Sequence, residues 1–202
     1  LVVYSTDQSG DLDLHLVCFE GRGENPGPDS GSYTGPVPVT FLNTGFNECY
    51  LSFYVSRFVK YPYGAVPEEI QELCFCSDRD GSYDLFSAPV PLNSDILEFL
   101  LSDTAPDISP ETVLNSPGDD MCPYIDGKLL VFASDRSGGF GGFDLWYSQR
   151  TATGWSEPTN FGDRINTEYN EFRPIVALYY EFTQDLMLFS SDRPGGKGGY
   201  DL

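Results

Sequence analysis

Aspartate and arginine side chains recur at regular intervals in this chain of 202 residues. A carboxylate beside a guanidinium can serve acid–base chemistry or hold a charged ligand. A catalytic site, however, needs one asymmetric constellation, whereas these groups return once per segment, which favours a structural role. The recurring positions are Asp78, Arg79 and Asp84; Asp135, Arg136 and Asp144; and Asp192, Arg193 and Asp201.

The place of these groups in turns predicts their bonds. An aspartate that opens a turn accepts hydrogen bonds from nearby backbone N–H groups, so Asp78, Asp135 and Asp192 are expected to bond within their own hairpins. In a fourth, similar segment Asp7 is followed by Gln8, so the positive charge is dispensable there. Each arginine is expected to pair with the aspartate that ends its own segment: Arg79 with Asp84, Arg136 with Asp144, and Arg193 with Asp201.

Two acidic segments resemble calcium loops, because calcium binds several carboxylates on a flexible turn that contains glycine. Gly81 stands at the wrong offset for an EF-hand, and Ser137 and Pro194 replace Asp80 in the sister segments. The sequence therefore predicts no cofactor, with calcium as the alternative left open. The two acidic sets are Asp78, Asp80 and Asp84, and Asp7, Asp11 and Asp13.

No catalytic motif is visible, and no catalytic, cofactor-binding or metal-binding residue is assigned. His15 is the single histidine, and no Gly-x-Ser-x-Gly nucleophile elbow accompanies it. The Gly-Gly-x-Gly-Gly runs at 138–142 and 195–199 join two predicted strands. A phosphate-binding glycine motif opens a helix instead, so phosphate binding is not indicated.

The five cysteines are irregularly spaced, which argues against a disulfide scaffold. Cys74 and Cys76 lie two apart on a predicted strand, so both side chains leave the same face and are expected to be buried as small apolar groups. A bridge between Cys49 and Cys74 is the one pairing that we would test. No second cysteine pair or histidine cluster supports a zinc site.

The polar positions belong to a repeated segment in which an apolar run, a turn and an Asp-Leu pair follow one another. A second motif of Asn and acidic residues alternates with it, at 42–48, 114–120 and 165–171. Two motifs that recur in one order indicate a repeat protein, built by stacking one supersecondary unit. The copies of the first motif are Val2 to Leu14, Leu73 to Leu85, Leu130 to Leu145 and Leu186 to Leu202.

Each repeat is predicted to be a meander of four antiparallel strands. The clearest copies give a first strand at Phe172 to Tyr180, a second at Leu186 to Ser191, a third at Phe143 to Gln149 and an outer strand at Trp155 to Phe161. Asp95 to Ser102 reads as a short helix or as the outer strand of the second unit. Repeated four-stranded sheets with glycine-rich hairpins predict an all-β fold, a β-propeller. Trp146, Trp155, Phe143 and Tyr200 are expected to fill the space between neighbouring blades.

Counting copies predicts an incomplete ring. A single propeller domain is expected over residues 1–202, with blade units at about 1–41, 42–105, 114–161 and 165–202. The first unit begins at its second strand and the last stops in its third, so we expect a fragment of a ring of six or more blades. Residues 15–40 carry no motif and are expected to form a loop.

The wording of these motifs resembles the WD-like propeller repeats of TolB-type proteins. The form most similar is found in Bacteroidetes envelope proteins, where the propeller often adjoins a peptidoglycan-binding OmpA-like domain. The resemblance is close over Leu114 to Leu202 and moderate over Phe41 to Pro89. It implies a periplasmic or outer-membrane-associated protein with protein partners in the envelope, peptidoglycan-associated ones among them. The segments that carry it are SDRPGGKGGYDL, SDRSGGFGGFDLWYSQR, GWSEPTNFGDRINTEYNEFRPIV and LNSPGDDMCPYIDGKLLVFASDR.

The formal net charge of −20 argues against nucleic acid as a partner, since its backbone demands lysine and arginine. It leaves basic proteins, divalent cations or simple solubility open. No apolar run approaches the roughly 18 residues of a membrane helix, so no transmembrane segment is predicted. We therefore expect a non-catalytic module that binds envelope proteins or cell-wall material. The alternative is the propeller of a prolyl-oligopeptidase-like peptidase or polysaccharide lyase whose catalytic residues lie elsewhere.

Overall fold

The computed structural model describes residues 1–19, 33–55, 58–61, 64–67, 70–177 and 186–202. Over these residues the chain is all-β, and its strands pair antiparallel. One short helix, α1 (Ile96–Leu100), lies in a connection, and Asp95 caps it by accepting hydrogen bonds from two backbone N–H groups. The described part of the chain holds no helix that is long and apolar enough to cross a membrane.

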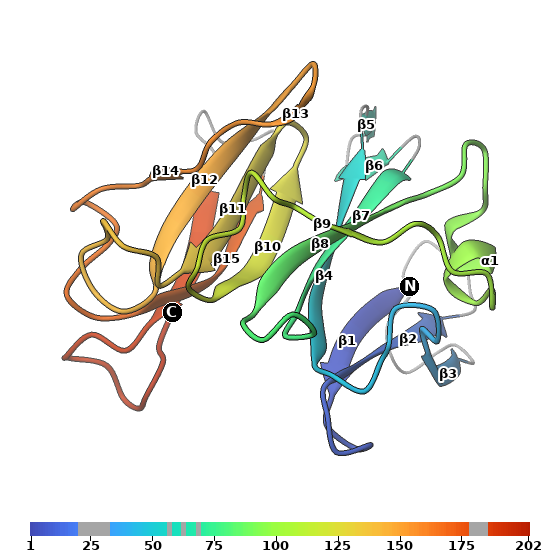
Figure 1. The fold of residues 1–202 in the computed structure, drawn as a ribbon, viewed down its shortest axis with the longest axis horizontal. Coiled ribbons are helices and arrows are strands. Elements are labelled where there is room, and N and C mark those ends of the chain that lie inside the picture. Colours follow the sequence, from blue (N-terminus) through green and yellow to red (C-terminus); the bar gives the residue numbers. More distant parts are fainter. Residues whose placement is uncertain (20–32, 56–57, 62–63, 68–69, 178–185) are drawn as a thin grey trace.

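Four separate sheets follow one another along the chain (Figure 1). The first contains β1 (Val2–Thr6), β2 (Asp13–Phe19) and β3 (Tyr33–Pro38). The second contains β4 (Glu48–Val55), β7 (Ile70–Ser77), β8 (Asp84–Pro89) and β9 (Ser109–Pro110). The third contains β10 (Asp120–Asp126), β11 (Leu129–Ser134), β12 (Asp144–Thr151), β13 (Gly154–Trp155) and β14 (Thr159–Asn160). The fourth contains β15 (Glu171–Ala177) and β16 (Leu186–Ser191), and a separate hairpin is formed by β5 (Phe58–Tyr61) and β6 (Gly64–Pro67).

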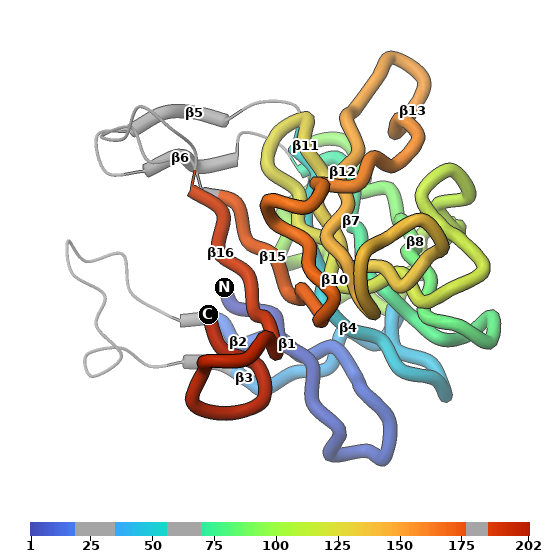
Figure 2. The backbone as a smooth tube through the Cα atoms, turned by 90° about the vertical axis from the view of Figure 1, so that its left-hand side faces the viewer, coloured from blue at the N-terminus to red at the C-terminus, as the bar shows by residue number. Residues whose placement is uncertain are grey.

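The sheets lie in the same order in space as in the sequence. β1 packs beside β4, β4 beside β10, and β10 beside β15 (Figure 1). The view turned by 90° shows the β15–β16 hairpin beside β10 and β11 (Figure 2). Contacts between consecutive sheets are therefore concentrated on β4, β10 and β15, the first strands of the later three sheets.

The hydrophobic core lies between consecutive sheets, in two clusters. Leu73 and Phe75 of β7 belong to the cluster shared with the first sheet and α1. Cys74 and Cys76 of the same strand belong to the cluster shared with the third sheet. Successive side chains of a strand point to opposite faces, so β7 buries both of its faces. This accounts for the uninterrupted apolar run at 73–76.

The predicted second strands are confirmed as antiparallel strands. Leu73 to Phe75 lies in β7, Leu130 to Phe132 in β11, and Leu188 to Phe189 in β16. Each of these strands pairs with the strand before it in its own sheet, β4, β10 and β15 respectively. The repeated motif therefore takes the same position in each of these three sheets.

The helical reading of one segment is confirmed, two predicted segments differ from the structure, and a further strand matches as far as it is described. Asp95 to Ser102 contains α1, and the outer strand of the second sheet is β9, past the expected bound at residue 105. The single outer strand expected at Trp155 to Phe161 is two short strands, β13 and β14, which both pair with β12. Residues 15–40 are not only a loop, because β3 pairs with β2. The predicted first strand at Phe172 to Tyr180 matches β15 as far as residue 177, and 178–180 lie outside the described residues.

The predicted aromatic packing is confirmed for both tryptophans. Trp146 and Trp155 are buried in the cluster between the second and third sheets, and the Trp155 ring meets that of Tyr54 edge-on, 5.9 Å between centroids. Phe143 is half-buried and contacts Phe172 of the next sheet. Tyr200 is 51% exposed, so its predicted burial is wrong.

Candidate functional site: acid clusters at the sheet junctions

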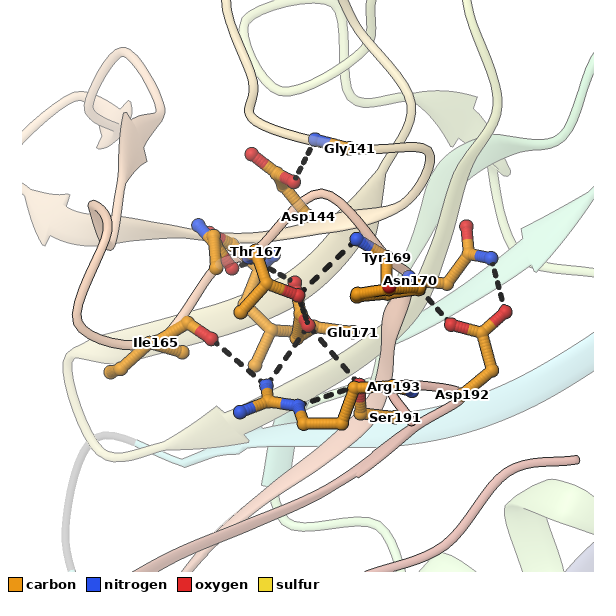
Figure 3. Close-up of polar contacts among 12 residues, drawn as sticks. Gly141, Asp144, Ile165, Thr167, Tyr169, Asn170, Glu171, Ser191, Asp192 and Arg193 are labelled. Atoms are coloured by element: carbon orange, nitrogen blue, oxygen red, sulfur yellow. Dashed lines mark hydrogen bonds and ion pairs between the residues drawn. The ribbon is translucent and has the colours of Figure 1, made fainter. Parts of the chain in front are cut away.

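A buried glutamate is the centre of the polar contacts in the fourth repeat (Figure 3). The Oε1 atom of Glu171 accepts hydrogen bonds from Arg193 Nη2 at 2.9 Å, the Thr167 hydroxyl at 2.7 Å and the Ser191 hydroxyl at 3.2 Å. Its Oε2 atom accepts the backbone N–H of Thr167 at 2.8 Å. The residue is fully buried. An ion pair and three hydrogen bonds thus compensate the cost of burying its charge.

The same arrangement recurs in the second and third repeats. Glu48, at the start of β4, accepts from Arg79 at 3.0 Å, from Ser77 at 2.8 Å and from both the N–H and the hydroxyl of Thr44. At the start of β10 the shorter Asp120 accepts from Arg136 and from the N–H of Ser116. Both acids are fully buried. We call each buried acid with its arginine and bonded neighbours an acid cluster; the acids are Glu48, Asp120 and Glu171.

The arginine of each acid cluster is held in the same way three times. Its Nε donates to the serine that ends the second strand, at 2.9–3.1 Å. Its Nη2 also donates to a backbone carbonyl in the loop before the first strand of the same sheet, and its guanidinium lies over a phenylalanine ring of the second strand. The serines are Ser77, Ser134 and Ser191; the carbonyls belong to Leu42, Leu114 and Ile165; the rings are Phe75, Phe132 and Phe189.

The predicted pairing of each arginine within its own segment is therefore wrong. Arg79 does not pair with Asp84, Arg136 does not pair with Asp144, and Arg193 does not pair with Asp201; their partners are Glu48, Asp120 and Glu171. The physical reason is burial. A carboxylate removed from water at the start of the first strand needs a cation, whereas the hairpin aspartates have backbone N–H donors.

The first aspartate of each segment bonds to the loop before the adjacent first strand. Asp192 accepts the backbone N–H of Asn170 at 2.8 Å and its side-chain amide at 2.7 Å (Figure 3). These two bonds hold the pKa of Asp192 below its usual value. Asp78 bonds Asn47 in the same two ways, and Asp135 accepts the N–H of Asp119. The prediction that these aspartates bond within their own hairpins is therefore wrong, because the N–H donors lie in another loop.

The turn-capping role belongs instead to the aspartate before the third strand. Asp144 accepts the backbone N–H groups of Phe140 and Gly141, and the Asn160 amide adds a third bond. Asp201 accepts those of Lys197 and Gly198. Asp84 has no glycine pair in its shorter hairpin, and burial together with the nearby carboxylate of Asp120 raises its pKa.

Two glycines of the hairpin at 138–142 have a steric cause. A Cβ atom at Gly141 would lie 2.1 Å from the carbonyl oxygen of Tyr169, in the loop before the fourth sheet. At Gly139 it would lie 2.6 Å from the carboxylate of Asp144. The hairpin can therefore contact its capping aspartate and the next repeat only with glycine at these positions.

The asparagine of the second motif links consecutive sheets, a role that the sequence reasoning missed. Asn166 accepts the N–H of Leu145 at 2.8 Å and donates to its carbonyl at 2.9 Å. This pair of bonds ties the third strand of one sheet to the loop that begins the next. The recurrence of this asparagine in the second motif is the sequence signal from which its role could have been inferred. The equivalent pairs are Asn43 with Leu14 and Asn115 with Leu85.

A different kind of site lies where the first strands meet. Tyr50, Cys122 and Arg173 each stand two residues after the buried acid, at a bulge, with φ of 58°, 57° and 52°. The left-handed region is unfavourable for residues with a Cβ atom. Both Arg173 Nε and Nη2 donate to the Tyr50 hydroxyl, at 3.0 and 2.8 Å, and the Cys122 thiol lies near that hydroxyl. Burial raises the pKa of Tyr50, so the phenol stays neutral.

An open cavity of about 350 Å³ adjoins this trio. Val3, Tyr4, Leu12 and Leu14 of the first sheet line it, together with Arg173. Four of the described arginines form an ion pair with a carboxylate. They are Arg79, Arg136, Arg150 and Arg193. Arg173 donates to a phenol from Nε and Nη2, and its side chain lines the cavity.

Within the described residues, the acidic side chains considered as calcium ligands do not form a metal site. His15 lies in β2, stacked on the ring of Tyr4. Within the described ranges no group of three or more His, Cys, Asp and Glu side chains is placed to hold a metal ion. Compared with known proteins, the chain matches no family model and no curated protein sequence.

Proposed function

We propose that the chain is a non-catalytic binding scaffold in which the four sheets are successive blades of a β-propeller. The observation that carries this proposal is the saturation of the recurring polar groups. Each buried acid in the acid clusters is bonded to its arginine, and each of these arginines also donates to a backbone carbonyl of the loop before the sheet, so these groups tie the first two strands of one sheet to that loop and serve a structural purpose.

The propeller arrangement is supported by order and repetition. Consecutive sheets pack in chain order through their first strands, and the acid clusters recur at each of the later three. A propeller places its sheets around one axis with the first strands innermost. A crystal structure would test this: parallel strands in one continuous sheet would contradict it.

The partner we propose is a protein of the bacterial envelope, in the periplasm or at the outer membrane. Similarity of the repeats to envelope propellers supports this location, and peptidoglycan-associated proteins are candidates. The net charge of −20 favours a partner with a basic surface, whose binding weakens as salt rises.

The cavity beside Arg173 is the proposed point of contact. A guanidinium that faces a phenol keeps donors for an acceptor on the partner, such as a carboxylate or a backbone carbonyl. The site is formed by side chains on first strands of separate repeats, in contrast to Arg79, Arg136 and Arg193, whose contacts are the same in each repeat.

A pull-down from envelope extract at low and high salt tests the function. Wild type should retain a specific partner at low salt, and Arg173→Glu should lose it. Arg164→Glu is the matched control, because Arg164 is exposed and does not line the cavity. Circular dichroism verifies that each variant folds. Hydrolysis or lyase turnover on peptides or glycans, without a specific partner, would overturn the proposal.

A further inference from the structure

Two buried cysteines face each other across the second sheet. Cys49 of β4 and Cys76 of β7 are register partners. Their sulfur atoms lie 3.2 Å apart, and both residues are at most 1% exposed. Directly opposed residues in antiparallel strands have Cα atoms about 4.5–5.5 Å apart, which is within the range of about 4.4–6.8 Å that a disulfide spans.

The bulge in β4 creates this pairing. Beyond the bulge Ser52 pairs with Cys74, and the register shifts between Cys49 and Ser52. If that register continued unshifted, Cys49 would stand opposite Ser77. The predicted partner Cys74 is therefore wrong, because the inserted residue brings Cys76 opposite Cys49 while Cys74 faces a serine.

The sister sheets show that packing at this position does not require cysteine. The equivalent pair is Met121 with Ala133 in the third sheet, and Phe172 with Ser190 in the fourth. Three sheets thus share one backbone arrangement, and only the second carries thiols on both strands. Two cysteines at one cross-strand pair point to a bond between them.

We propose that Cys49 and Cys76 form a disulfide when the chain folds under oxidising conditions. The oxidant is a disulfide compound, such as oxidised glutathione. The thiolate of one cysteine attacks it to give a mixed disulfide and releases one glutathione thiol. The second cysteine then attacks the mixed disulfide, forms the Cys49–Cys76 bond and releases the second thiol. The protein loses two protons and two electrons, which the oxidant receives as it becomes two thiols.

The timing of the reaction follows from burial. Burial and the contact with Cys49 raise the pKa of the Cys76 thiol, so the folded protein holds little of the reactive thiolate. Exchange therefore takes place before β4 and β7 close into the core. Afterwards the second and third sheets shield the bond, because both sulfurs belong to the cluster between them.

Refolding in a mixture of reduced and oxidised glutathione, followed by alkylation and non-reducing tryptic digestion, tests the proposal. Cleavage after arginine and lysine places Cys49 in the peptide 23–57, and Cys74 with Cys76 in the peptide 61–79. We expect these peptides to be linked, at a mass lower by two hydrogens. Chymotryptic cleavage after Phe75 then separates Cys74 from Cys76 and identifies the bonded residue.

Cys74→Ala is the matched control, since Cys74 lies in the same strand and peptide and is equally buried. It should keep the link, whereas Cys49→Ala and Cys76→Ala should lose it. Reduction should lower the Tm of wild type by roughly 5–10 °C, as expected for a loop of this length, and leave Cys76→Ala unchanged. Free thiols at both positions after oxidative refolding, or a link to Cys74 or Cys122, would overturn the proposal.

Discussion

The acid clusters and the first-strand bulges are both repeated three times, yet they differ in what is repeated. In the acid clusters the same residue types return with the same bonds, as around Glu48 and Glu171. At the bulges only the backbone returns, and the side chains are Tyr50, Cys122 and Arg173. Positions that repeat in chemistry tie the first two strands of each sheet to the loop before it. Positions that repeat only in geometry are free to serve a function specific to this chain.

The largest effect is expected from removing a buried acid. Asp120→Ala leaves Arg136, which is 12% exposed, without its partner, and breaking a buried ion pair costs about 3–5 kcal/mol. Glu171→Ala should cost less, because Arg193 is 42% exposed and water can replace the carboxylate. Urea unfolding followed by tryptophan fluorescence measures both. Glu157→Ala, at an exposed acid, is the control; equal losses for all three would remove the distinction.

The next effect concerns the asparagine that joins two sheets. Asn166→Ala removes both hydrogen bonds to Leu145 and leaves its buried N–H without a partner, while its carbonyl keeps the N–H of Phe161 at 3.2 Å. We expect a loss of about 2–4 kcal/mol in unfolding free energy. Thermal unfolding checks this, with Gln8→Ala as a control because Gln8 is an exposed amide in a turn and has no positive φ. A loss no larger than in the control would show that these two hydrogen bonds contribute little to the free energy of unfolding.

A smaller effect is expected at the bulges, where substitution by glycine should destabilise the protein less than substitution by alanine. Arg173→Gly and Arg173→Ala both remove the bonds to Tyr50, but only glycine adopts the left-handed conformation without strain. The glycine variant should be more stable than the alanine variant by about 1 kcal/mol. The same comparison at Arg193, which has no positive φ, should give no advantage to glycine. Chemical denaturation of the four variants decides the matter.

The smallest effects concern the hairpin aspartates and depend on pH. The raised pKa of Asp84 means that its ionisation weakens the folded state, so Asp84→Asn should raise stability at pH 7 and have no effect at pH 3, where the carboxyl is protonated. The lowered pKa of Asp192 contributes stability that is present above its unfolded pKa and is lost as pH falls through its folded value. Asp192→Asn should therefore lower stability at pH 7. Unfolding measured from pH 3 to pH 7 checks both variants. A change in stability of the same sign for both at pH 7 would contradict the prediction.

Much of the fold could be predicted from local patterns. The run at 130–134 and the glycine-rich hairpin after it indicated a strand and a turn, and both are present as β11 and the loop before β12. Outer strands were predicted less well. β9, β13 and β14 are each two residues long, and segments so short carry no periodicity from which a strand can be recognised.

The candidate site was predicted in its residues but not in its contacts. The sequence predicts Asp135 and Arg136 as recurring groups. Asp120 belongs to the second motif, at 114–120, and the sequence predicts no role for it. The partner of Arg136 is 16 residues away on another strand. Local spacing favoured Asp144, because hairpin neighbours are close in the chain. The burial of Asp120, which makes it the stronger partner, is not visible in the sequence.

The sequence by itself determined the repeat, the antiparallel strands and the alternation that buries both faces of β7. These features follow from short-range periodicity and from turn chemistry, which neighbouring residues specify. The tertiary structure decided which acid meets each arginine, which cysteine faces Cys49 and where Tyr50 meets Arg173, 123 residues away. These contacts depend on strand register and on the packing of one sheet against the next. A single inserted residue in β4 changes the register, and only the packed sheets determine where that residue is accommodated.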